Sequence, residues 1–220
     1  MSESGSKSLW RARELIGSVL VLGWAGFHLW EQWSAFGGRE PFVARMTSTS
    51  HGGAMLWVEV LFAVLPALAW IGIEVRLLMS GPEPSELRDA MAETPEMSKR
   101  LGGIVRVGSW VFFLFLLVHM AWLFLPKLTE GSEPLRAWLR LQDGLGTWPM
   151  AIVHALGLTG FAVHVCGAVP RLAIVMGWVP TPESRRAARL SGLIMAVGFG
   201  VLYAQLAGWY AAGAGTIWPM

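Results

Sequence analysis

The sequence predicts an all-α integral membrane protein, a bundle of five transmembrane helices. Its composition is the first reason: 54% of the 220 residues are hydrophobic and only 15% are charged, against about 25% in soluble globular proteins. The second reason is five apolar stretches, each long enough for the roughly 20 helical residues that cross a bilayer. So much apolar surface needs lipid as its solvent.

The five stretches form one domain over residues 1–220. The predicted spans lie near residues 15–33, 54–79, 104–125, 149–175 and 190–212. Residues 37–41, 80–100, 127–147 and 179–184 have the glycine, proline and charged residues of loops. Gly and Ala are frequent in the fifth span, as in helices that pack closely within lipid.

The positive charges predict the orientation. With these spans, twelve Lys and Arg residues fall on the side of the N-terminus and five on the other side. Cytoplasmic loops carry the excess of Lys and Arg, so we expect a cytoplasmic N-terminus, an outside C-terminus and a location in the cell inner (cytoplasmic) membrane. No cleaved signal peptide is expected, because the first apolar run is long and no small-residue cleavage site follows it.

Two counts exclude other classes of protein. The single cysteine, Cys166, excludes an intramolecular disulfide and a multi-cysteine zinc or iron–sulfur site. The formal net charge of +2 is too small to indicate nucleic-acid binding.

Four histidines lie in or at the edges of the apolar spans, where polar side chains are costly and often functional. At about 1.5 Å per residue, His28 and His119 both lie roughly 20 Å from the cytoplasmic edge, in the outer half of the membrane. His154 lies about 8 Å from the outer face, close to the same level, and His164 about 22 Å from that face.

Two imidazoles at one depth on different helices are the ligands that a six-coordinate haem needs. His28 and His119 are therefore candidate ligands. The alternative is that these histidines form hydrogen bonds between helices, which is the favoured interpretation for His154 and for His164 taken alone.

The order and spacing of several motifs resemble a known family. They are Arg11 through His28; Arg106-Val107-Gly108-Ser109 followed by Val118-His119-Met120-Ala121-Trp122; and His164 followed by Gly177-Trp178 and Thr181-Pro182-Glu183-Ser184-Arg185-Arg186. The chain resembles, over nearly its whole length, the five-helix dihaem cytochrome b membrane anchor of succinate:menaquinone oxidoreductases and fumarate reductases. In that family the first and third spans supply the ligands of an outer haem, and the second and fourth those of an inner haem.

One position departs from the family pattern. Leu56 to Val60 and Leu65 to Ala69 are similar to the family's second helix, but Trp70 stands where the inner haem ligand is expected. Trp has no lone pair to offer iron. Three outcomes stay open: no inner haem, a five-coordinate haem on His164 with Trp70 packed against it, or a ligand recruited from elsewhere. Since the rest of the span resembles a haem-binding helix, we expect the second haem to be retained.

The resemblance implies a haem b anchor that passes electrons between an iron–sulfur subunit and a membrane quinone, here menaquinone. A flavoprotein and the iron–sulfur subunit on the cytoplasmic face would carry the dicarboxylate chemistry, because this chain lacks FAD and cluster sites. The alternatives are a non-catalytic scaffold or solute carrier with structural histidines, and a haem anchor of another respiratory complex. Association into oligomers stays open.

Quinone reduction consumes protons, so protonatable groups near a membrane edge are candidates for the quinone site. On the outer side these are Glu31, His51, Glu59 and His154. On the inner side Arg11, Arg13, Arg106 and Ser109 form the alternative group.

Overall fold

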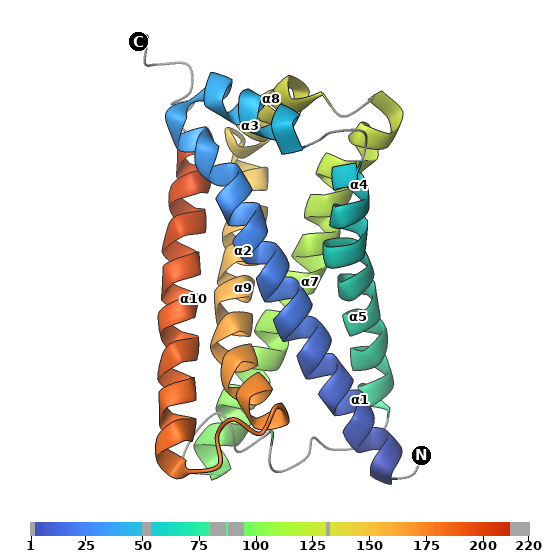
Figure 1. The fold of residues 1–220 in the computed structure, drawn as a ribbon, viewed down its shortest axis with the longest axis vertical. Coiled ribbons are helices and arrows are strands. Elements are labelled where there is room, and N and C mark those ends of the chain that lie inside the picture. The colour runs from blue at the N-terminus through green and yellow to red at the C-terminus, as the bar shows by residue number, and fades with distance from the viewer. Residues whose placement is uncertain (1–2, 50–53, 80–86, 88–94, 131–132, 212–220) are drawn as a thin grey trace.

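The computed structural model describes residues 3–49, 54–79, 87, 95–130 and 133–211, and every element within them is helical. Long helices lie side by side in a bundle, and two short helices cover one end (Figure 1). The short helices are α3 (Arg39–Thr49) and α8 (Pro134–Leu145). We call their end of the bundle the outer end, and the opposite end, where α1 begins, the inner end.

The N-terminal residues form one helical run from the inner end to the outer end (Figure 1). Helix α1 (Glu3–Leu15), the π-helical segment η1 (Ile16–Leu20) and α2 (Val21–Gln32) follow one another without a gap. A 3₁₀ segment, η2 (Trp33–Gly37), then leads into α3. This run contains the first predicted span.

Four described helices are long and apolar enough to cross a membrane: Trp57–Leu78, Lys99–Leu123, Trp148–Val175 and Pro182–Ala211. They correspond to the second to fifth predicted spans. The elements are α4 (Ala54–Glu59), η4 (Val60–Val64), α5 (Leu65–Leu78), α7 (Pro95–Glu130), α9 (Trp148–Val175) and α10 (Pro182–Ala211). An all-α, multi-pass membrane protein is thereby confirmed, while the first crossing and the sides of the termini stay predictions.

The outside of the bundle suits lipid. On α10, for example, the side chains of Leu193, Ile194, Val197 and Val201 are all exposed. In water such a continuous apolar surface would be an aggregation site, whereas in a bilayer it contacts the apolar lipid tails.

Two tyrosines of α10 show how that helix runs. The Tyr203 hydroxyl donates to the Ala25 carbonyl over 2.6 Å, and the Tyr210 hydroxyl donates to Gln32 Oε1 over 2.9 Å. Both contacts advance by seven residues along each helix, so α10 and α2 are parallel. Helix α10 therefore ends at the outer end of the bundle, as Figure 1 also shows.

Pro66 explains the π-helical segment in the second predicted span. Proline has no backbone N–H and its ring clashes with the preceding turn of a regular helix. The π-helical turn at Val60–Val64 widens the helix immediately before it, and Pro66 occupies the first turn of α5, where a missing N–H is tolerated.

The turn between α9 and α10 has clear stop and start signals. Gly177 adopts a φ of +73°, and the N–H of Trp178 donates to the Ala173 carbonyl over 2.9 Å, the bond of a glycine-ended helix. Helix α10 then begins with a reciprocal cap, because the Ser184 N–H donates to Thr181 Oγ1 and the Thr181 N–H donates to Ser184 Oγ. The Thr-Pro-Glu-Ser motif thus has a structural role.

Glycines let α7 and α9 approach closely. A Cβ atom placed on Gly160 would lie 2.8 Å from both the Gly108 carbonyl oxygen and the Phe112 backbone nitrogen. At Gly157 it would lie 2.1 Å from the Phe115 ring, and at Gly167 2.3 Å from Val105. Small residues at such crossings bring backbones together in lipid.

We expect Gly160→Ala to lower the thermal unfolding temperature of the protein in detergent. Backbone atoms of α7 block the added methyl group, so the two helices must separate. Gly198→Ala on α10 is the matched control, since no atom lies within 4 Å of the added Cβ, and alanine favours a helix. Equal unfolding temperatures for both variants would contradict the close packing.

All four predicted loops are wrong in part, because residues 95–100 and 127–130 belong to α7 and residues 182–184 to α10. Residues 134–145 form α8 and residues 39–41 begin α3. In α8, Trp138, Leu141 and Leu145 recur at spacings of three and four, and all three are buried. They pack with Phe42 and Met46 of α3. Each short helix has one apolar face, and each covers the outer end with it.

Candidate functional site

An apolar cavity lies in the outer half of the bundle, beneath α3 and α8. Phe42 and Met46 of α3 and Ala137, Leu141 and Leu145 of α8 line its outer part. Its volume is about 150 Å³. Its lining is mostly apolar with a few polar side chains among the apolar ones, which is typical of sites that bind small molecules and cofactors.

His28 of α2 and His119 of α7 both line this cavity. Their ring centroids are 6.4 Å apart and the rings are inclined by 80°. Two imidazoles that bind one metal from opposite sides, with bonds of about 2.0–2.1 Å, have centroids about 6 Å apart. The structure therefore brings the two predicted ligands together at a spacing close to that of an axial pair.

Aromatic and acidic side chains hold the His28 ring. Trp24, one helical turn earlier, stacks on it with centroids 5.6 Å apart and an angle of 21°. His28 Nδ1 lies 3.9 Å from a carboxylate oxygen of Glu31, which is itself fully buried. A carboxylate beside Nδ1 favours the tautomer that leaves Nε2 as the acceptor nitrogen.

His119 is bonded to a second histidine. His119 Nδ1 lies 3.2 Å from His154 Nε2, and His154 Nδ1 lies 2.8 Å from the Met150 carbonyl oxygen. His154 comes from α9 and is buried. The predicted match in level between His119 and His154 is thus a direct contact.

Three of the four outer quinone candidates share this cavity. Glu31, Glu59 and His154 line it, and all three side chains are buried. The fourth, His51, lies outside the described residues. The cavity therefore combines an apolar wall with two carboxyl groups and an imidazole that can exchange protons.

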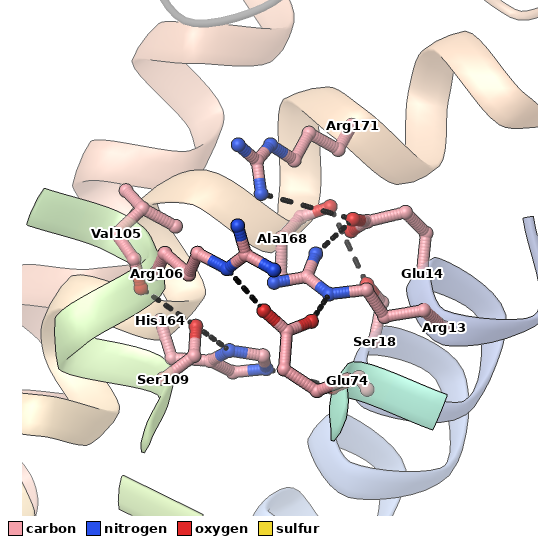
Figure 2. A network of polar contacts seen from close by, with 11 residues as sticks. Arg13, Glu14, Ser18, Glu74, Val105, Arg106, Ser109, His164, Ala168 and Arg171 are labelled. Atoms are coloured by element: carbon pink, nitrogen blue, oxygen red, sulfur yellow. Dashed lines mark hydrogen bonds and ion pairs between the residues drawn. The ribbon is translucent and has the colours of Figure 1, made fainter. Parts of the chain in front are cut away.

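The inner half of the bundle is arranged differently (Figure 2). Both ring nitrogens of His164 are hydrogen-bonded: Nε2 lies 2.9 Å from the Gly17 carbonyl oxygen, and Nδ1 lies 2.9 Å from Ser109 Oγ. A carbonyl can only accept, so Nε2 carries the proton. Nδ1 faces the Ser109 hydroxyl, which also lies 2.7 Å from the Val105 carbonyl oxygen. Neither nitrogen presents a lone pair to a metal in this arrangement.

Trp70 fills the space beside His164. Its ring is 1% exposed, stacks on Phe113 with centroids 4.1 Å apart, and meets the His164 ring at 6.4 Å and 89°. A Cβ on Gly17 would lie 3.0 Å from the indole Cδ1 and Nε1 atoms. The predicted meeting of Trp70 and His164 is a packed contact. The two residues do not fit a pair of haem ligands, because both His164 nitrogens are engaged and Trp has no lone pair to offer iron.

A buried ionic network, which the sequence analysis missed, lies next to this contact (Figure 2). Glu74 accepts from Arg13 and from Arg106, and Arg13 also pairs with Glu14. Arg171 Nη1 lies 3.7 Å from Glu14. Of these five side chains only Arg106 is partly exposed, and Glu74 is fully buried.

The network gives roles to the inner quinone candidates. Arg13 and Arg106 form ion pairs with Glu74, and Ser109 is hydrogen-bonded to His164. All three side chains therefore have structural contacts inside the bundle. Arg11 is exposed and stands apart from the network. The missed members were visible in the sequence as charged residues within or beside apolar runs, which need partners in a membrane protein.

The donor set decides which kind of metal group the cavity suits. Within the described part of the chain, no three His, Cys, Asp or Glu side chains are grouped to hold a bare metal ion. A haem brings four nitrogen ligands of its own and asks the protein for one or two axial ligands. His28, His119 and the apolar cavity between their helices fit that requirement.

No protein-family model, no curated protein and no solved structure matches the chain.

Proposed function

We propose that this chain is a haem b membrane anchor of a succinate dehydrogenase or fumarate reductase complex. It would pass electrons between an iron–sulfur subunit and a membrane quinone. One observation carries the proposal: imidazoles from two different helices, with ring centroids 6.4 Å apart, line the same mostly apolar cavity. The resemblance of the motifs around His28, His119 and Thr181 to the cytochrome family supports this choice of complex.

When bound, the haem iron accepts and donates one electron at a time. The chain's own residues supply the rest of the site. His28 and His119 would hold the iron, Trp24 packs on the His28 ring, and the apolar wall would keep water away from the macrocycle. In such a low-dielectric cavity the axial ligands and their hydrogen bonds set the redox potential.

The protons for quinone reduction would come through the outer cavity. Glu31, Glu59 and His154 are the candidate groups, since they line it together. Menaquinone is the quinone that the family resemblance favours. The flavoprotein and iron–sulfur subunits would dock on the basic inner side, where Lys and Arg can pair with acidic patches.

We propose one haem for each chain, because Trp70 and the hydrogen-bonded His164 occupy the inner position. This differs from the sequence-based expectation of a second haem on His164. Trp70 has the bulk to fill the space, and packed interiors leave few voids.

Purification of the complex from membranes tests the proposed function. We expect a b-type absorption spectrum, copurifying flavin and iron–sulfur subunits, and reduction of the haem by succinate. Absence of haem would favour the scaffold alternative. A haem that copurifies with hydrogenase or formate dehydrogenase subunits would assign the chain to another respiratory complex.

A further inference from the structure

The contact between His119 and His154 has a defined direction. The Met150 carbonyl, 2.8 Å from His154 Nδ1, can only accept a hydrogen bond. His154 Nδ1 therefore carries a proton, and in the neutral ring His154 Nε2 is then an acceptor. His119 Nδ1, 3.2 Å away, must donate to it.

The same reasoning assigns the second ring nitrogen of His119, Nε2. A neutral imidazole carries one proton, so a proton on Nδ1 leaves the lone pair on Nε2. Nε2 is then the nitrogen that can bind iron. Ligand histidines in metal sites commonly donate their second N–H to a fixed acceptor, which sets the ring orientation and raises the basicity of the ligand.

Neighbouring side chains also hold the His154 ring in place. His154 is 7% exposed. Its ring meets Phe115 at 5.2 Å and 78° and Trp122 at 5.7 Å and 74°. Its Nδ1 bond reaches back one turn of its own helix to Met150, so the ring has little freedom to rotate. His154 is therefore a hydrogen-bond acceptor whose ring is held in one orientation.

We infer that His154 is a positioning residue for the haem. It holds His119 in the Nδ1–H tautomer, aims Nε2 into the cavity and makes the ligand a stronger electron donor, which stabilises the oxidised iron. This inference rests on the proposed haem site, and it gives His154 a role distinct from the proton exchange proposed for Glu31 and Glu59.

Two substitutions in the haem-loaded complex test the inference. His154→Leu replaces the acceptor with an apolar side chain, and His154→Gln supplies an amide oxygen that can accept from His119. We expect His154→Leu to shift the ratio of reduced to oxidised haem towards reduced at a fixed potential, because the ligand loses the acceptor that makes it more basic. His154→Gln should lie between this value and the wild type.

A second measurement does not depend on haem. In the purified wild-type chain, labelled with ¹⁵N-histidine, NMR should show His154 as the Nδ1–H tautomer. The Nε2–H tautomer would overturn the inference, whatever the haem content.

The outcomes separate this inference from the proposed function. A wild-type chain without haem refutes the haem site and leaves the tautomer measurement to decide on the role of His154. A wild-type haem whose potential is the same in both variants overturns the role of His154 and leaves the haem site standing. If His154→Leu loses haem and His154→Gln keeps it, the positioning role is supported; if both lose it, the tautomer decides.

Discussion

Replacement of Glu74 by glutamine is expected to destabilise the protein by about 3–5 kcal/mol, the usual cost of removing one partner from a buried ion pair. Glu74 is fully buried and accepts from both Arg13 and Arg106. Without its charge, Arg13 and Arg106 would each lose an ion pair inside the bundle. Unfolding in detergent, followed by tryptophan fluorescence, measures the change.

Two further variants make this prediction specific. Glu133→Gln removes an ion pair to Arg136 in which both side chains are 53% exposed, so it should cost no more than about 1 kcal/mol. Arg106→Gln added to Glu74→Gln removes one uncompensated charge and should recover part of the loss. A Glu74→Gln protein as stable as the wild type would contradict the role of the network.

His119→Ala is expected to abolish the low-spin haem spectrum completely. In the proposed site, the substitution removes one of the two nitrogens that would hold the iron. The reduced-minus-oxidised spectrum of the purified complex measures the loss.

His164→Ala is the matched control. His164 is a buried histidine on a membrane helix, like His154, but its bonds to Gly17 and Ser109 are structural. We expect the low-spin spectrum to persist in this variant, with lower stability. If the spectrum is lost in His164→Ala and survives in His119→Ala, the assignment is reversed. If it survives in both variants, His154 becomes the candidate ligand.

The sequence was sufficient to predict the long apolar helices and the pairing of His28 with His119. Both depend on local rules: the length needed to cross a bilayer, and a fixed rise of about 1.5 Å per residue. Depth along two helices is readable from residue numbers, so two rings at one level can be proposed without coordinates. The short helices α3 and α8 have the same kind of signal, an apolar face at spacings of three and four.

The inner position could not be predicted in the same way. The sequence shows that Trp70 cannot be a ligand, but whether the space closes depends on side-chain packing. The space closes because the Trp70 indole lies against Gly17 and stacks on Phe113. The pairing of Glu74 with Arg13 and Arg106 likewise depends on how three separate helices meet, which spacing within one helix does not give.

The number of haems for each chain tests the account most directly. Haem, assayed as the pyridine haemochrome, is compared with protein from amino-acid analysis of the purified complex. We expect one low-spin haem per chain, held by His28 and His119. No haem would contradict the outer site, and two would contradict an inner position filled by Trp70 and His164.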